Sequence, residues 1–281
     1  MKIFHAGKDT EMDRLDCAIL VNSTPSYYYI LPFFFKLLRR YAPNLRWDVV
    51  LATEVPDHPV CRKLEKECAV KILPIPESSK GFLESRATAS RIVAETYTYC
   101  LPLQDDFLLE MPMNDRELHK ILDFMDKSMS TVSARCMPCP GPSRDSLPVP
   151  GIDSWKTISK ETDPVGFTFQ ATLWRTKALA AWYERISGRL EALCPKESQQ
   201  TQKRKDIELR ENIAENSFGQ LEFWEWSDEK DYDHLAFERV GPWSNAVYLS
   251  PFPYRPTAIV RGRLETWAQD LAKREGIELS N

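Results

Sequence analysis

The first half of the chain alternates short apolar runs with amphipathic segments, and this alternation constrains the fold more than any other feature. Apolar runs predict strands at 17–22, 45–53 and 69–75, and helical spacing of apolar residues predicts helices at 26–41 and 59–68 between them. Strands that alternate with helices form parallel sheets, because each helix returns the chain to the same edge of the sheet. The sequence therefore predicts an α/β fold.

The same alternation continues to residue 136. A predicted helix at 81–95 leads into a strand at 96–103, and a predicted helix at 114–127 leads into a strand at 129–136. We therefore expect the first half to be an open α/β layer of the nucleotide-binding type. It contains neither G-x-G-x-x-G nor a Walker-type glycine loop, so any phosphate would be held by a metal ion and by side chains.

The fourth predicted strand ends in two adjacent carboxylates, Asp105 and Asp106. Open α/β sheets bind ligands at the carboxyl ends of their strands. Neighbouring acids repel one another and are costly to desolvate, so they persist most easily beside a divalent cation or a cationic ligand. The alternative is that they begin a turn and cap the next helix. Their spacing leaves both interpretations open.

The second half of the chain has a different character. Residues 138–150 are rich in Pro, Gly and Ser, which predicts an irregular connection. An apolar run at 167–175 predicts a strand that continues into a helix at 176–188. A polar stretch at 196–205 is typical of a loop, and a further helix is expected at 207–216.

Composition narrows the class of protein. The 281 residues, 43% of them hydrophobic, are enough for one large core or two fused halves. A net charge of -4 argues against a nucleic-acid binder that neutralises phosphates. No apolar run reaches transmembrane length, and seven scattered cysteines are typical of reduced thiols, so a cytoplasmic protein is expected.

One acid of the second half, Glu222, stands beside Phe223 and Trp224. A carboxylate desolvated by aromatic side chains suits a general base. The alternative is an exposed helix glutamate beside core aromatics, and the residues alone favour that alternative.

Taken in order, the segments resemble GT-A fold glycosyltransferases that use nucleotide sugars, in particular small bacterial and large-DNA-virus members. The resemblance spans roughly 16–276 and depends on the order of four segments: 103–107 (preceded by Ser85 and Arg86), 169–175, 215–222 and 258–262. It implies a single GT-A-like domain with an open, mostly parallel central sheet. Its nucleotide-sugar half would be 16–137, and its acceptor half, with a C-terminal closing strand and helix, 138–281.

The resemblance also implies roles for individual residues. Asp105 and Asp106 would hold Mn²⁺ or Mg²⁺ as a DXD-type metal motif, although its first position here is Gln104 and no histidine follows near the C-terminal strand. Glu222 would be the base of an inverting, direct displacement. Residues implied to bind the nucleotide sugar are Asn22, Ser23, Thr24, Arg86, Gln104, Asp105, Gln170 and Arg261.

Several of these residues have simpler interpretations. Asn22, Ser23 and Thr24 could cap a helix after the first strand. Arg86 and Arg261 suit phosphate oxygens because guanidinium binds them bidentately, but each could equally form a surface ion pair.

The predicted function is transfer of a sugar, a hexosyl or related group, from a nucleotide-diphosphate sugar to a hydroxyl acceptor such as a glycan. Breaking a sugar-phosphate bond leaves negative charge on the diphosphate, which a cation would stabilise. The alternatives are a sugar nucleotidyltransferase, disfavoured by the missing glycine-rich basic loop, and an inactive GT-A-like module that binds a glycan or a protein. No nucleic-acid partner and no transmembrane segment are expected.

Overall fold

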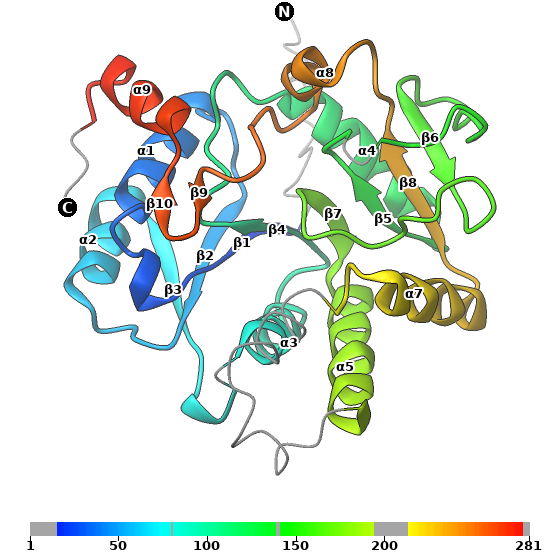
Figure 1. The fold of residues 1–281 in the computed structure, drawn as a ribbon, viewed down its shortest axis with the longest axis horizontal. Helices are drawn as coiled ribbons and strands as arrows, with labels where there is room; N and C mark the ends of the chain where they lie inside the picture. Colours follow the sequence, from blue (N-terminus) through cyan, green and yellow to red (C-terminus); the bar gives the residue numbers. More distant parts are fainter. Residues whose placement is uncertain (1–15, 80, 139–140, 194–212, 278–281) are drawn as a thin grey trace, which may run out of the picture.

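One eight-stranded sheet organises the part of the chain that the computed structural model describes, residues 16–79, 81–138, 141–193 and 213–277 (Figure 1). Its strand order is β3-β2-β1-β4-β7-β5-β8-β6. The strands are β1 (Cys17–Asn22), β2 (Asp48–Thr53), β3 (Val70–Pro74), β4 (Tyr99–Gln104), β5 (Thr131–Arg135), β6 (Trp155–Ile158), β7 (Thr172–Arg175) and β8 (Asp233–Phe237).

Most neighbouring strands run parallel. β3, β2, β1 and β4 are parallel to one another, and β5 is parallel to β8. β7 is antiparallel to both β4 and β5, and β6 lies antiparallel to β8 at the edge. The predicted α/β class with a mostly parallel central sheet is therefore confirmed.

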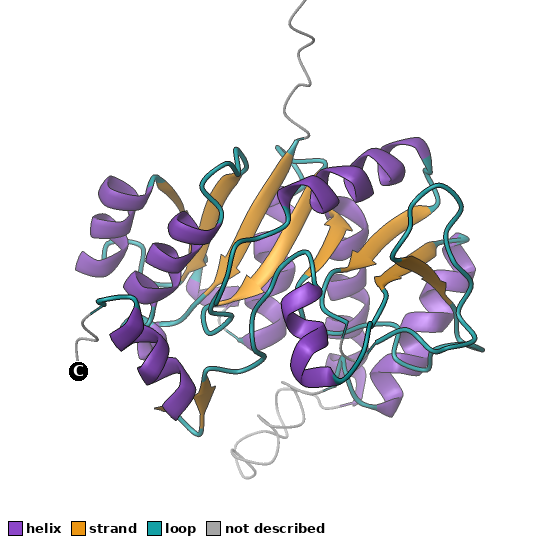
Figure 2. Cartoon of the chain, turned by 90° about the horizontal axis from the view of Figure 1, so that it is seen from above, coloured by secondary structure: helices purple, strands orange, loops and turns teal. Residues whose placement is uncertain are grey.

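Helices cover both faces of the sheet (Figures 1 and 2). The apolar cluster on one face includes side chains of α1, α2, α4 and α9, and the cluster on the other face includes side chains of α3, α5 and α7. None of the described helices is long and apolar enough to cross a membrane. The helices are α1 (Leu31–Tyr41), α2 (Pro59–Cys68), α3 (Phe82–Val93), α4 (Asp115–Lys127), α5 (Thr176–Leu193), α7 (Ser217–Lys230), α8 (Trp243–Leu249) and α9 (Thr266–Arg274), with 3-10 turns η1 (Pro25–Tyr27) and η2 (Glu77–Ser79).

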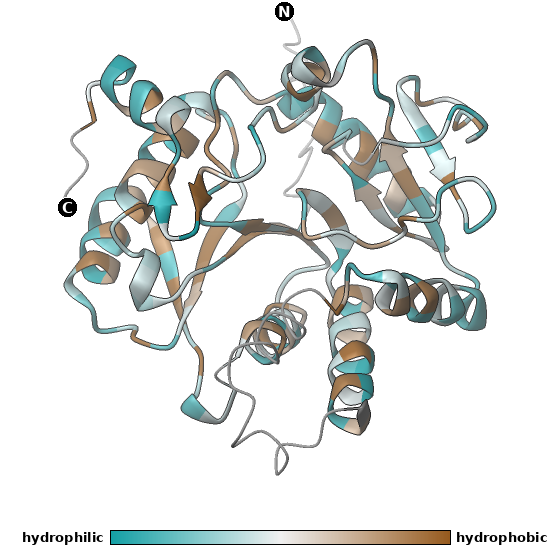
Figure 3. Ribbon diagram, viewed as in Figure 1, coloured by the Kyte–Doolittle hydropathy of each residue, from teal (hydrophilic) through white to brown (hydrophobic). Residues whose placement is uncertain are grey.

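β1, a central strand of the sheet, is apolar on both sides. Ile19 and Val21 of β1 face the α1 cluster, while Ala18 and Leu20 face the α3 cluster, and all four are fully buried. A strand covered on both faces reads as a continuous apolar run. Figure 3 accordingly shows hydrophobic colour along the central strands, with more hydrophilic colour on the outer helices.

Several predicted boundaries were wrong. The helix expected at 176–188 continues to Leu193, and the strand expected at 45–53 begins only at Asp48. The helix expected at 26–41 begins only at Leu31, because Pro32, which has no N–H to donate, suits a first helical turn. The strand expected at 167–175 is reduced to Thr172–Arg175, and the residues before it form a loop. The loop expected at 196–205 and most of the helix expected at 207–216 lie outside the described residues.

The C-terminal closing strand is a short hairpin. β9 (Ile259–Val260) pairs antiparallel with β10 (Arg263–Leu264), so Arg261 and Gly262 form a two-residue turn. Both turn residues have positive φ, 51° and 72°, as a type I′ hairpin turn requires. β6, β8 and α8 have no counterpart among the elements predicted from the sequence.

Candidate functional site

The acid pair lies at the carboxyl edge of the parallel strands. β4 runs beside β1 with Gln104 opposite Asn22, and both strands end there. A turn follows, in which the N–H of Phe107 donates to the carbonyl oxygen of Gln104 at 3.2 Å. This turn presents Asp105 and Asp106 at the edge where open α/β sheets bind ligands.

The acid pair does not cap the next helix. α4 is capped by Asn114, whose Oδ1 accepts from the backbone N–H of Glu117 at 3.1 Å. The alternative prediction was that Asp105 and Asp106 begin a turn and cap the next helix. The turn is present, but the predicted helix cap is wrong. The two carboxylates are therefore not explained by helix capping.

Both carboxylates are largely removed from water, with Asp105 8% and Asp106 9% exposed. Burial raises the pKa of Asp105 to about 7, against the opposing effects of the Ser23 hydroxyl and the positive charge of Arg86. Burial also raises the pKa of Asp106, although hydrogen bonds from the backbone of Ile259 and Ala258 favour its charged form. The pair is thus arranged to gain from a bound proton or cation.

The acid pair offers too few ligands to hold a divalent cation without help from other groups. Among the described residues no group of three or more His, Cys, Asp or Glu side chains could hold a metal ion. Asp105 and Asp106 would therefore supply at most two carboxylates, with the remaining ligands from phosphate oxygens and water, as is usual for Mg²⁺. Asp106 can accept its backbone hydrogen bonds and still offer lone pairs to an ion.

The end of β1 contributes polar groups beside the acids. The Oδ1 atom of Asn22 is buried and has no hydrogen-bond partner within the described chain. Ser23 lies against Asp105. Thr24 is exposed at the N-cap of η1, but its side chain makes no capping bond. No capping bond is thus seen for Thr24, and a buried acceptor is left available to a ligand.

Arg86 lies on α3 and faces the same edge. Its guanidinium stacks on the ring of Phe82 at 3.7 Å and donates to the carbonyl oxygen of Phe82 at 3.0 Å. Only 9% of Arg86 is exposed. It is therefore not the exposed arginine of a surface ion pair, and its charge acts on Asp105.

A small cavity joins α3 to the ends of β1 and β4. Its volume is about 10 Å³, room for about one water molecule. Polar lining comes from Asn22, Arg86, Gln104 and Thr168. A larger ligand would lie over this edge rather than inside the cavity.

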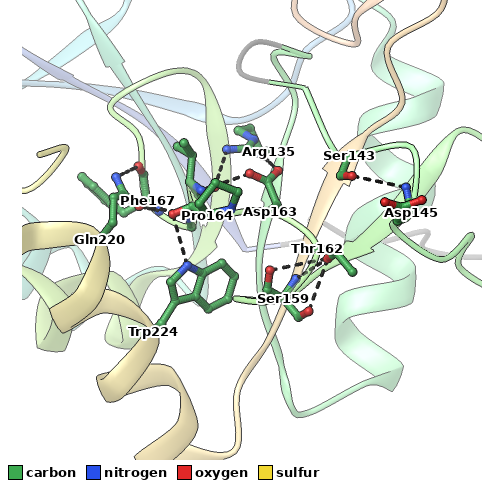
Figure 4. Close-up of polar contacts among 12 residues, drawn as sticks. Arg135, Ser143, Asp145, Ser159, Thr162, Asp163, Pro164, Phe167, Gln220 and Trp224 are labelled. Carbon is green, nitrogen blue, oxygen red and sulfur yellow. Dashed lines mark hydrogen bonds and ion pairs between the residues drawn. The ribbon is translucent and has the colours of Figure 1, made fainter. Parts of the chain in front are cut away.

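The loop before β7 lines this cavity with Phe167, Thr168 and Phe169, and several hydrogen bonds hold it in place (Figure 4). The Oε1 of Gln220 accepts from the N–H groups of Gly166 and Phe167 at 2.8 and 3.1 Å, and its Nε2 donates to the carbonyl oxygen of Phe167 at 2.8 Å. At the start of the loop, Asp163 forms a buried ion pair with Arg135 at 2.9 Å. Gln220, for which no role was predicted from the sequence, thus fixes the loop that carries Gln170.

Close packing explains the glycine in this loop. A Cβ at Gly166 would lie 2.3 Å from the ring of Phe223 and 2.8 Å from Trp224. Trp224 also donates from Nε1 to the carbonyl oxygen of Pro164 at 3.4 Å. Trp224 therefore packs under the loop, in the core.

The C-terminal segment brings an unpredicted residue, Tyr254, to the site. Its ring is fully buried and stacks on Phe107 with centroids 4.4 Å apart. Its hydroxyl donates to Oε1 of Gln170 at 2.7 Å and accepts from the N–H of Ala171 at 2.9 Å. Tyr254 therefore connects Gln170 to the residue that follows Asp106. Its position in Pro253-Tyr254-Arg255-Pro256 offered no periodic signal that could have identified it.

Glu222 is not brought to the acid pair by any contact among the described residues. It is buried between α5 and α7, where its Oε2 accepts from Arg185 at 3.2 Å and from Arg189 at 3.0 Å. The preferred alternative of an exposed glutamate is wrong, because Glu222 is 7% exposed. Its role as a base stays a prediction.

Arg261 stands at the exposed tip of the β9–β10 hairpin. The same segment contributes the Ala258 and Ile259 backbone groups that lie against Asp106. Arg261 is thus close in sequence to groups that touch the acid pair, while its own side chain is on the surface.

A groove far larger than the small cavity beside Arg86 lies elsewhere. Its volume is about 620 Å³, and it runs along α4 opposite residues 150–152. Charged side chains of α4 line it, including Arg116, Lys120 and Lys127. It shares no lining residue with the acid pair.

No family model and no curated protein matches the chain. Solved structures with a similar arrangement include TarS of S. aureus, with 16% identity and a TM-score of 0.38 over 59% of this chain and 29% of that one. A structure of TarS 1–349 has 14% identity and a TM-score of 0.40 over 61% and 49%. The 4-diphosphocytidyl-2C-methyl-D-erythritol synthase of Anaerococcus prevotii has 11% identity and a TM-score of 0.35 over 72% and 99%.

The chain spans less than half of either TarS structure. Likenesses of this distance support no assignment of activity to this chain.

Proposed function

We propose that this protein is a glycosyltransferase that moves a sugar from a nucleotide-diphosphate sugar to a hydroxyl acceptor with the help of Mn²⁺ or Mg²⁺. The observation that carries the proposal is the buried pair Asp105 and Asp106 at the carboxyl edge of β4. Two desolvated carboxylates that cap no helix are costly in a protein without a cationic ligand.

The neighbouring groups suit the parts of such a donor. A bound cation would stabilise the negative charge that develops on the leaving diphosphate. Arg86 is buried beside Asp105 and would contact the diphosphate, which a guanidinium binds well. Arg261 would reach the same group from the hairpin tip. Gln104 and Gln170 would donate hydrogen bonds to donor oxygens.

The end of β1 would hold the nucleoside. Asn22 offers a buried oxygen without a partner in the described chain, which a ribose hydroxyl or a base N–H would satisfy. Ser23 and Thr24 follow it at the same edge. A buried acceptor left unpaired costs free energy, so its pairing with a ligand would contribute to specificity.

Glu222 is the proposed base of an inverting, direct displacement. Both arginines donate to its Oε2, and its Oε1 accepts no hydrogen bond from any described residue. Oε1 is therefore the oxygen that would take the proton of the acceptor hydroxyl. The acceptor would have to approach between α5 and α7.

A thermal-shift screen of nucleoside diphosphates, with and without Mn²⁺, tests the donor site. Ligands that bind only the folded protein raise its apparent stability, so the correct nucleotide should increase Tm only when Mn²⁺ is present. Asp106→Asn should abolish that increase. Asp123→Asn removes one exposed acid of α4 and is the matched control, which should respond like wild type.

The outcomes separate the candidate classes. Stronger stabilisation by nucleoside triphosphates, with pyrophosphate release, would indicate a nucleotidyltransferase. Binding of a glycan without turnover of any donor would indicate an inactive module. An Mn²⁺-independent response that Asp106→Asn leaves intact would refute the donor site.

A further inference from the structure

The hydroxyl of Tyr254 determines how the amide of Gln170 is oriented. This hydroxyl accepts from the N–H of Ala171 at 2.9 Å and lies 2.7 Å from the Gln170 amide. Tyr254 is fully buried, so its single hydrogen needs an acceptor within the protein. The amide oxygen of Gln170 supplies that acceptor. The reversed amide would leave the Tyr254 hydrogen facing an N–H₂ group.

The amide nitrogen of Gln170 is then left for another partner. Within the described part of the chain, its Nε2 donates to no backbone or side-chain acceptor, and Gln170 is half-buried rather than exposed. The chain on both sides of Gln170 is held in place. Before it, the hydroxyl of Thr168 and the N–H of Phe169 both donate to Oε1 of Glu215, at 2.9 and 2.6 Å, and after it the N–H of Ala171 donates to Tyr254. A donor held in this way is preorganised for a ligand acceptor.

The same tyrosine connects this amide to the acid pair. The ring of Tyr254 stacks on Phe107, which directly follows Asp106 in the chain. The ring of Phe252 packs edge-on against Tyr254, with ring centroids 5.6 Å apart. The charge of Asp106 acts on the Tyr254 hydroxyl. The side chain of Tyr254 therefore links Gln170 to the turn that contains Asp105 and Asp106, where the cation would bind.

We propose that Tyr254 is a positioning residue: it locks the Gln170 amide so that the N–H₂ group donates to an oxygen of the diphosphate sugar bound at Asp105 and Asp106. This inference rests on the proposed function and adds to it the residue that fixes the donor contact. Tyr254 itself touches no ligand in this arrangement.

The substitution Gln170→Glu separates the hydrogen bond that Gln170 accepts from Tyr254 from the one that it would donate to the ligand. A glutamate oxygen still accepts the Tyr254 hydrogen bond, so the melting temperature without ligand should stay close to that of wild type. The second oxygen cannot donate and repels phosphate, so affinity for the nucleoside diphosphate selected in the Mn²⁺ screen should fall about ten- to hundredfold. If Gln170 were purely structural, Gln170→Glu would leave the affinity for the nucleoside diphosphate unchanged.

The substitution Tyr254→Phe tests the positioning role directly. It should lower nucleotide affinity about tenfold, and the double variant with Gln170→Leu should be no weaker than Gln170→Leu alone, because both remove one interaction. Tyr248→Phe is the matched control. Tyr248 lies in the same C-terminal segment as Tyr254, and its hydroxyl donates to Oε1 of Glu110 at 3.3 Å. It should bind nucleotide like wild type.

Isothermal titration of each variant with the nucleoside diphosphate and with its sugar derivative shows which ligand oxygen accepts the hydrogen bond from Gln170. Loss with both ligands assigns the bond to a phosphate oxygen, and loss only with the sugar derivative assigns it to a sugar oxygen. Wild-type affinity in Gln170→Glu, or independent effects in the double variant, would overturn the positioning role while the proposed function stands. A wild-type protein that binds no nucleotide would instead refute the proposed function. If Tyr254→Phe fails to fold, Gln170→Glu alone decides.

Discussion

Replacing Asp105 with asparagine should make the metal-free protein more stable. The burial that raises the pKa of Asp105 to about 7 also makes its ionised form costly in the folded state. An ordinary aspartate has a pKa near 3.9, and each pKa unit corresponds to about 1.4 kcal/mol, so ionising Asp105 costs about 4 kcal/mol of stability above pH 7. An uncharged amide avoids most of this cost.

The sign of the pH dependence follows from the same values. Between about pH 4 and pH 7 the unfolded chain loses the Asp105 proton while the folded protein keeps it, so wild-type stability falls as pH rises through this window. Asp105→Asn lacks that loss. The variant should therefore gain about 2–4 kcal/mol over wild type at pH 8 and little at pH 4, once the cost of burying an amide is included.

Denaturant unfolding in EDTA at pH 4 and pH 8 measures the difference in stability between Asp105→Asn and wild type. At pH 8 this difference corresponds to a rise in Tm of roughly 5–10 °C.

The contrasting variant is Asp163→Asn. In the wild-type protein the carboxylate of Asp163 pairs with the buried Arg135 at 2.9 Å. The substitution removes the carboxylate charge that faces the buried guanidinium of Arg135 and should cost about 3–5 kcal/mol. If Asp105→Asn is destabilising at pH 8 like Asp163→Asn, Asp105 is a structural acid and the reasoning is refuted.

Three further predictions concern other parts of the fold. His234 is buried with a pKa lowered to about 3, so the free energy of unfolding should decline as pH falls from 6.5 towards 3, by at most about 4–5 kcal/mol, and His234→Gln should reduce this slope in urea titrations. Glu222→Gln should lower kcat about a hundredfold with nucleotide affinity kept; equal loss of both would show a structural residue. Gly166→Ala should cost about 1–3 kcal/mol in chemical unfolding, because its Cβ would meet Phe223 at 2.3 Å, and an unchanged midpoint would contradict this packing.

Local patterns were sufficient to predict the sheet of the first half. The strand that ends at Gln104 and the helix that carries Arg86 lie close to their predicted ranges, because buried parallel strands and amphipathic helices have distinct periodicities. The strand expected at 167–175 was wrong in its first half because tertiary contacts override propensity there. Gln220 binds the backbone of Gly166 and Phe167, which a strand would have used for pairing.

The site was only partly accessible to the same reasoning. Asp105 and Asp106 were recognisable because an apolar strand ends directly in two acids. Tyr254 was not, because it reaches Gln170 through a segment 84 residues later in the chain. The ion pairs of Glu222 with Arg185 and Arg189 likewise join α7 to α5, helices whose packing no short motif specifies.

Turnover of a nucleotide sugar is the most direct test of the central claim that Asp105 and Asp106 form the donor site of a sugar transferase. Purified protein is incubated with Mn²⁺ and a panel of nucleotide-diphosphate sugars, and the released nucleoside diphosphate is measured. We expect release from a preferred donor that stops with EDTA and in Asp106→Asn, while Asp123→Asn stays active. Release that persists in Asp106→Asn, or no release from any donor, would refute a donor site at Asp105 and Asp106.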